Sequence, residues 1–143
     1  MRFLLLLTIF LSTIFAAQID DVAKVLDYQR EYKIALEMAK KANKPIMLVV
    51  VADYCPWCKK FEHKTLEDTL VKEAVSKGFI PLIVDKLIEK GSFPAQYEAK
   101  LIPTTYFINP KTGESLYEVV AYRSKAQFLK DLNEATNAYK DEK

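Results

Sequence analysis

Seven consecutive apolar residues, at positions 46–52, end just before the first of the chain's only two cysteines. A run with no polar position, rich in β-branched residues, is typical of a strand that is buried on both faces. Such a strand lies in the middle of a sheet that helices cover on both sides. The run therefore predicts an α/β fold in which Cys55 and Cys58 follow the end of a central strand.

The rest of the chain supplies helices and further strands for that sheet. The spacing of apolar residues predicts helices over residues 20–43, 56–64 and 68–77, and a last helix after Ser124. Runs of β-branched and aromatic residues predict strands over residues 79–84, 104–108 and 115–121, the last two forming a hairpin. The predicted architecture is a mixed central sheet flanked by helices on both faces, without an internal repeat.

Two of the predicted helices carry specific packing expectations. The last helix opens on a capping box formed by Ser124 and Gln127. Its inward stripe is expected to be Phe128, Leu132, Ala135 and Tyr139. In the helix over residues 68–77, the side chains expected to face the sheet are those of Leu70, Val71, Ala74 and Val75.

The first seventeen residues differ from the rest of the chain. A short basic start precedes an almost wholly apolar stretch over residues 3–15, which two alanines close. This order is typical of a secretory signal peptide, and a helix of this length is too short for the roughly 30 Å hydrocarbon core of a bilayer. We therefore expect a signal peptide over residues 1–17, cleaved near residue 17, and one exported domain over residues 18–143 with no membrane span. An uncleaved N-terminal anchor is the alternative.

Composition excludes two broad classes of protein. The 21 basic residues are nearly balanced by 19 acidic ones, and the two signs are interleaved along the chain. A nucleic-acid binder would show a strong basic excess or a basic stripe, so no nucleic-acid partner is expected. The apolar fraction of 50% supplies enough surface to bury on folding, which excludes an intrinsically disordered chain.

The two cysteines form the motif C-P-W-C. A bridge between Cys55 and Cys58 would close a very short loop and so would constrain the unfolded chain little, which favours a redox role over a local staple. A structural zinc site needs four ligands, and the chain adds only His63; haem attachment needs a histidine where Lys59 stands. We expect no bound cofactor or metal. Two thiolates suit copper(I), which remains the metal alternative.

The position of the motif predicts how its two sulfurs differ. Pro56 fits the first position of a helix, which places Cys55 at the helix cap, where free backbone N–H groups favour the thiolate. Cys55 is thus the predicted nucleophile, exposed and partly ionised. Cys58 lies one turn deeper and would resolve the mixed disulfide that forms with a substrate.

Three side chains beside the cysteines have two interpretations each. Trp57 is the only tryptophan and is expected to be exposed, either as a contact for partner proteins or as a cover for the disulfide. Lys59 and Lys60 could add positive charge near the sulfurs. We favour the simpler interpretation that these lysines belong to a solvated helix face.

The motif and its surroundings resemble the thioredoxin superfamily over roughly residues 28–138. The likeness rests on C-P-W-C after a buried strand, on the segment Leu101-Ile102-Pro103-Thr104 before another strand, and on the closing hairpin and helix. Within the superfamily the chain is most similar to exported thioredoxin-like proteins and to the C-terminal reductase domain of bacterial thiol:disulfide interchange proteins. Residues 61–68 carry much of this closer likeness.

The resemblance implies a substrate-binding surface around the cysteines. Pro103 would be the cis-proline that faces the active-site disulfide, and Ile102 would offer its backbone to an extended substrate segment. Tyr54 would occupy the aromatic position that precedes the first cysteine. With Pro56 and Trp57, these are the expected substrate-binding residues.

Two departures from the family's pattern put details of the site in doubt. Many thioredoxins carry a buried acid six residues before the first cysteine, and here that position holds Val49. Asp53 is close in the sequence but is expected at the rim. A glycine commonly found two residues before the cis-proline is replaced by Leu101, which could reshape the substrate groove.

The resemblance implies an exported thiol-disulfide oxidoreductase, which reduces or isomerises protein disulfides in a bacterial periplasm. Its expected partners are protein disulfides and a membrane-bound thiol electron donor, and the protein is expected to be a monomer. The alternative is a copper(I) carrier or metalloprotein assembly factor that uses the same two thiolates. A non-enzymatic adaptor is disfavoured, because both cysteines are present at the productive spacing.

Overall fold

The computed structural model describes residues 18–142, so the predicted signal peptide lies outside the described residues. One sheet has the strand order β2-β1-β3-β4. β1 (Ile46–Val51) runs parallel to β2 (Ile80–Asp85) and antiparallel to β3 (Thr104–Ile108), and β3 forms a hairpin with β4 (Ser115–Val120). The structure confirms the predicted mixed sheet and its hairpin.

Every residue of β1 is buried, as the unbroken apolar run predicts. Because successive side chains of a strand point to opposite faces, the strand contributes to two separate cores. Met47, Val49 and Val51 pack into one hydrophobic cluster. Ile46, Leu48 and Val50 pack into the other. β1 therefore anchors both layers of the domain.

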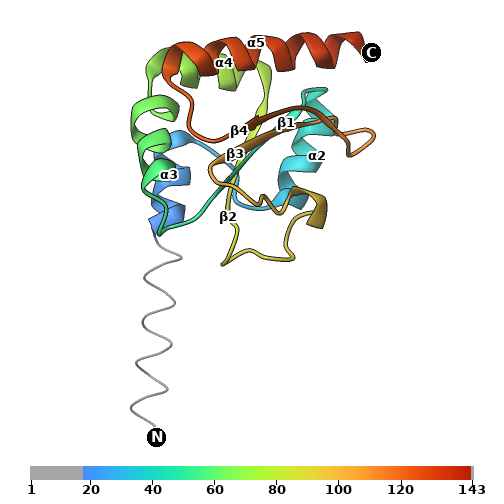
Figure 1. The fold of residues 1–143 in the computed structure, drawn as a ribbon. Coiled ribbons are helices and arrows are strands. Elements are labelled where there is room, and N and C mark those ends of the chain that lie inside the picture. Colours follow the sequence, from blue (N-terminus) through green and yellow to red (C-terminus); the bar gives the residue numbers. More distant parts are fainter. Residues whose placement is uncertain (1–17, 143) are drawn as a thin grey trace, which may run out of the picture.

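Helices cover the two faces unequally (Figure 1). On the first face lie α3 (Pro56–Phe61), α4 (Thr69–Gly78) and α5 (Lys125–Asp141), together with a helical segment at residues 18–26. On the second face lie α2 (Tyr32–Ala42) and the short 3-10 helix η2 (Ala95–Tyr97). No helix within residues 18–142 is long and apolar enough to cross a bilayer.

The single helix predicted over residues 20–43 is wrong. The helix at 18–26 ends at Asp27, whose φ is 60°, and the backbone of Gln29 then pairs with the outer edge of β2 near Leu82. Tyr28 packs on the first face of the sheet, whereas Ala35 packs on the second. A continuous helix could not reach both faces, so the chain breaks and crosses at the edge of β2.

The connection from α3 to α4 also departs from the prediction. It is a π-helical turn, η1 (Glu62–Leu66), followed by α4, whose N-cap Asp68 accepts hydrogen bonds from two backbone N–H groups. In α4, Val71 and Val75 are buried as predicted. Leu70 is 54% exposed, contrary to prediction, because the line of contact with the sheet follows Val71 and Val75.

The last helix forms as its sequence predicts. Ser124 and Gln127 make both hydrogen bonds of the capping box at the start of α5. The predicted stripe of Phe128, Leu132, Ala135 and Tyr139 is buried. This helix packs against both α4 and β4. Its N-terminal end lies beside η1, so α5 supports the segment that follows the cysteines.

Candidate active site

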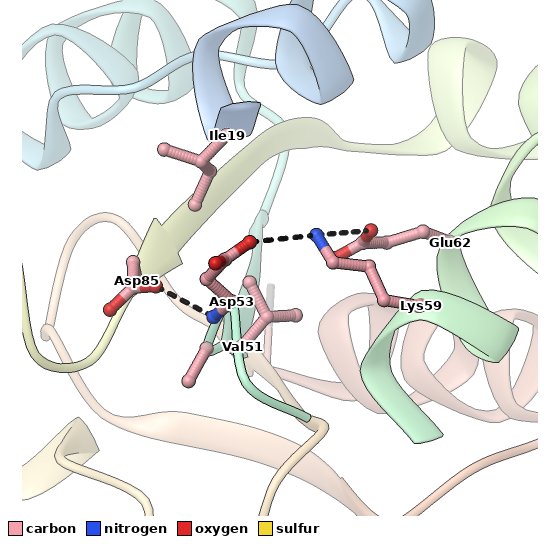
Figure 2. Close-up of a pocket in the computed structure, with 7 residues that line it drawn as sticks. Ile19, Val51, Asp53, Lys59, Glu62 and Asp85 are labelled. Atoms are coloured by element: carbon pink, nitrogen blue, oxygen red, sulfur yellow. Dashed lines mark hydrogen bonds and ion pairs between the residues drawn. The ribbon is translucent and has the colours of Figure 1, made fainter. Parts of the chain in front are cut away.

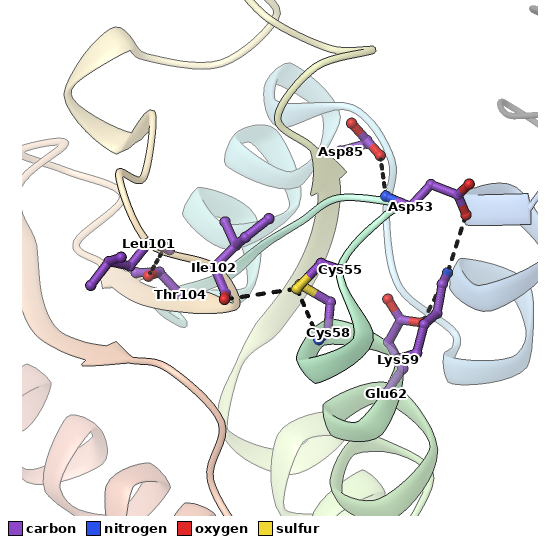
Figure 3. The surroundings of a disulfide bond; sticks show 9 residues. All are labelled: Asp53, Cys55, Cys58, Lys59, Glu62, Asp85, Leu101, Ile102 and Thr104. Atoms are coloured by element: carbon purple, nitrogen blue, oxygen red, sulfur yellow. Dashed lines mark hydrogen bonds and ion pairs between the residues drawn. A yellow bond between two sulfur atoms is a disulfide. The ribbon is translucent and has the colours of Figure 1, made fainter.

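Cys55 is the N-cap of α3, and Pro56 is the first residue of the helix. The Sγ atom of Cys55 accepts a hydrogen bond from the backbone N–H of Cys58 at 3.1 Å. The two cysteines form a disulfide with their Cα atoms 5.2 Å apart (Figure 3). The start of the helix thus presents a backbone donor to the first sulfur, as the motif predicts.

The exposure predicted for Cys55 is wrong, because this residue is only 6% exposed and Cys58 is fully buried. The carbonyl oxygen of Ile102 lies 3.8 Å from the Sγ of Cys55, a contact that Figure 3 marks with a dashed line. The Ile102–Pro103 peptide bond is cis. The loop that carries these two residues therefore covers part of the disulfide.

The remaining predicted substrate-binding residues surround this buried disulfide. Tyr54 and Trp57 are 66% and 56% exposed, Pro56 is also exposed, and Pro103 is buried. Leu101 is 66% exposed, and its carbonyl accepts a hydrogen bond from the Thr104 hydroxyl at 2.7 Å. The disulfide therefore lies within a rim of exposed apolar and aromatic side chains.

A surface cleft of about 280 Å³ lies between the C-P-W-C motif and the cis-proline loop and is lined by Trp57, Ile102, Ala121 and Tyr122. Sequence reasoning missed Ala121 and Tyr122, which follow β4 and are far from the motif along the chain. The N–H of Ala121 donates to the carbonyl of Pro103 at 2.8 Å, which holds the end of the hairpin against the cis-proline loop. The predicted hairpin was the only available signal for this contact.

On the other side of the motif, charged residues surround a cavity of about 10 Å³, which Ile19 helps to close (Figure 2). The Nζ of Lys59 lies 3.5 Å from an oxygen of Asp53 and 3.4 Å from an oxygen of Glu62. The N–H of Asp53 donates to the Asp85 carboxylate at 3.0 Å. Lys59 is therefore an ion-pair partner within the site, and its predicted role in a solvated face is wrong.

Glu62 is the buried acid that sequence reasoning missed. Its residue is 1% exposed, and burial raises the pKa of its carboxyl group, while the positive charge of Lys59 acts in the opposite direction. Val49, at the position where many thioredoxins have an acid, is buried among apolar residues. Glu62 lies four residues after Cys58 and thus on the same helix face, which was the available signal. Asp53 lies at the rim as predicted, with 27% of its side chain exposed.

Glu62→Gln should gain stability relative to the wild type as the pH rises. The pKa of Glu62 is higher in the folded protein than in the unfolded chain. Its favourable contribution to the free energy of unfolding is therefore complete at a pH below its pKa in the unfolded chain, and it is lost as the pH rises through its pKa in the folded protein. Glutamine does not titrate, so it avoids that loss. Urea unfolding of the oxidised protein at pH 4, 6 and 8 measures the difference in free energy of unfolding.

Glu73→Gln is the matched control for this experiment. Its hydrogen bond to Lys77 lowers the pKa of the exposed Glu73. The contribution of Glu73 to the free energy of unfolding is therefore present at a pH above its pKa in the unfolded chain, and it is lost as the pH falls through its pKa in the folded protein. The stability difference should consequently change in the opposite direction. A pH-independent difference for Glu62→Gln would show that Glu62 has an ordinary pKa.

The chemistry of this site comes from its redox-active pair of sulfur atoms. Within residues 18–142, no group of three or more histidine, cysteine, aspartate or glutamate side chains is placed to hold a metal ion. The two sulfurs can exchange between a disulfide and a dithiol, and a backbone donor and a backbone acceptor flank the first of them. This geometry suits thiol-disulfide exchange.

The chain is similar in sequence to a known protein. The chain is 26% identical over 98 residues to the thiol:disulfide interchange protein DsbD of Yersinia pestis, a match that covers 66% of this chain and 16% of that protein. The chain thus spans less than a fifth of this curated relative.

Solved structures show the likeness over most of the chain. A DsbH oxidoreductase superposes with a TM-score of 0.66 at 23% identity, covering 76% of this chain and 83% of that one. A thioredoxin from Thermus thermophilus gives 0.63 at 24% identity, covering 74% and 84%. The reduced C-terminal domain of Neisseria meningitidis DsbD gives 0.60 at 22% identity, covering 72% and 92%. The family model for the thioredoxin-like domain matches residues 32–136, and the chain therefore belongs to the thioredoxin-like domain family.

Proposed function

We propose that this protein is an exported thiol-disulfide oxidoreductase that reduces or isomerises protein disulfides in a bacterial periplasm. The single observation that carries the proposal is the placement of Cys55 at the helix cap, where its sulfur accepts the N–H of Cys58 at 3.1 Å. A hydrogen bond donated to sulfur favours the thiolate over the thiol. Cys55 is accordingly the nucleophile.

The reaction begins from the reduced dithiol. The Cys55 thiolate attacks one sulfur of a substrate disulfide, forming a mixed disulfide and releasing the first substrate thiolate, which takes up a proton. The Cys58 thiol then loses its proton and attacks the Cys55 sulfur, which releases the second substrate thiolate. The substrate gains two electrons and two protons, and Cys55 and Cys58 become the disulfide. No bound cofactor is needed.

The cis-proline loop and the aromatic rim provide the substrate-binding surface. The Ile102 carbonyl, 3.8 Å from the Cys55 sulfur, can accept a backbone hydrogen bond from an extended substrate segment. Tyr54, Pro56 and Trp57 are exposed beside the sulfur and can contact the flanking side chains. Pro103 has no N–H to donate, which leaves Ile102 as the backbone partner.

Export and the source of electrons rest on different support. The basic start and apolar stretch of residues 1–17 have the order of a secretory signal peptide. The match to a thiol:disulfide interchange protein supports a partner dithiol as the electron donor. We place that donor in the membrane, and we propose that the protein acts as a monomer in the periplasm.

The reduction potential of the cysteine pair tests the proposed direction of electron flow. The protein is equilibrated with glutathione buffers, and the fluorescence of Trp57, the only tryptophan, reports the redox state. We expect a value of about −270 mV, near that of thioredoxin. A value of about −120 mV, near the strong oxidants, would instead identify a disulfide donor. Stoichiometric copper(I) binding without reduction of insulin would support the metal-carrier alternative.

A further inference from the structure

The ammonium group of Lys60 lies over two aromatic rings at the edge of the cleft. Its Nζ is 4.7 Å from the ring centroid of Trp57 and 4.8 Å from that of Tyr122. The two ring centroids are 5.7 Å apart. Contacts at these distances are attractive, because the face of an aromatic ring carries partial negative charge. The rings therefore fix the position of a positive charge that an exposed lysine would otherwise not hold.

The charge of Lys60 is not neutralised by a carboxylate. Three basic residues around it have acidic partners within 4 Å: Lys59 pairs with Asp53 and Glu62, Arg123 with Asp131, and Lys125 with Asp68. In the part of the chain that the structure describes, Lys60 has no ion pair of this kind. The edge of the cleft thus presents one fixed and unneutralised positive charge.

The cleft beside this charge is mostly apolar and is connected to the reactive sulfur through Ile102. Trp57 and Tyr122 line it together with Ile102, whose carbonyl oxygen is 3.8 Å from the Cys55 sulfur. A segment that binds at the Ile102 carbonyl lies beside the cleft that Ile102 lines, and a side chain that reaches the rings of Trp57 and Tyr122 from there also meets Lys60. A basic side chain in that position would be repelled by Lys60, and the outer ring faces are already occupied.

We propose that Lys60, Trp57 and Tyr122 form a specificity subsite, which selects substrate proteins whose reactive cysteine is flanked by an acidic residue and an apolar one. The carboxylate pairs with the Lys60 ammonium, and the apolar side chain enters the cleft. This inference rests on the proposed function, since it names the class of substrate for that reaction. The rings hold Lys60 in place before the substrate arrives, so little side-chain freedom is lost on binding.

Three disulfide-linked peptides test the subsite. They are identical except for aspartate, asparagine or lysine beside the cysteine, with a leucine on the other side. The value of kcat/KM is measured for each peptide and divided by the same variant's value with hydroxyethyl disulfide, a small uncharged substrate. We expect the wild type to prefer the aspartate peptide over the lysine peptide by roughly fivefold, the effect of an exposed ion pair. This preference should decrease at 0.5 M NaCl.

Lys60→Gln should remove the preference for aspartate, and Lys60→Glu should reverse it. Lys64→Gln is the matched control for Lys60→Gln, because Lys64 is exposed one turn further along and makes none of the ring contacts of Lys60. This variant should keep the wild-type preference. An unchanged preference in both Lys60 variants, or no preference in the wild type, would overturn the subsite.

A redox-inert set of peptides separates the subsite from the proposed function. Serine replaces cysteine in each peptide, and binding to the oxidised protein is followed by the fluorescence of Trp57. We expect the aspartate peptide to bind more tightly than the other two peptides, and we expect Lys60→Glu to abolish this difference. That result supports the subsite even if the protein fails to reduce hydroxyethyl disulfide and the proposed function is lost. Equal binding of all three peptides would contradict the subsite alone.

Discussion

Cys55→Ser is expected to lower the rate of insulin reduction by about a thousandfold or more, the scale of loss when a nucleophile is removed. Serine has nearly the shape of cysteine, but its hydroxyl group is not ionised at neutral pH and cannot form a disulfide. The backbone N–H that donates to the Cys55 sulfur then has no thiolate to stabilise. The rate is followed by the turbidity of insulin with dithiothreitol as the source of electrons.

Cys58→Ser is the partner variant, because it should retain the first step and lose the second. Cys55 can still attack a substrate disulfide, but the mixed disulfide is no longer resolved from within the protein. A covalent adduct with the substrate should therefore accumulate and disappear on reduction. If Cys55→Ser trapped the adduct and Cys58→Ser did not, the roles of the two cysteines would be exchanged.

The parts of the fold that sequence reasoning predicted correctly depend on local patterns. The strand at residues 46–51 needs only its own apolar run, and the cap of α3 needs only the adjacent Cys55 and Pro56. The capping box of α5 likewise lies within four consecutive residues. In each case the residues that determine the structure are neighbours in the chain, so their pattern is visible before folding.

The features that were missed depend on contacts between distant segments. The break at Asp27 occurs because Gln29 pairs with the edge of β2, more than fifty residues later. The cleft needs Tyr122, which the β3–β4 hairpin brings beside Trp57. The pairing of Lys59 with Asp53 likewise appears only when the loop after β1 folds beside α3, whereas the pairing of Lys59 with Glu62 is local, between residues three apart. Helical periodicity contains no information about which face of a sheet a residue will meet.

Phe61→Ala is expected to lower the free energy of unfolding by about 3 to 5 kcal/mol, as for other buried phenylalanines. Phe61 is 1% exposed, and its ring meets that of Phe128 edge-on at a centroid distance of 5.1 Å. It also lies edge-on to Tyr122 at 6.4 Å. The substitution leaves a cavity where α3 meets α5, because rigid helices on either side cannot close it fully. Urea unfolding of the oxidised protein measures the loss.

Leu70→Ala is the matched control, since it also removes a large apolar side chain from this layer but at a position that is 54% exposed. Its effect should stay within about 0.5 kcal/mol. Because the ring of Phe61 packs edge-on against that of Tyr122, Phe61→Ala should also weaken the preference for the aspartate peptide. Leu70→Ala should leave this preference intact. A loss of stability below about 1 kcal/mol would mean that the core around Phe128 repacks, and that the cleft does not depend on Phe61 for its shape.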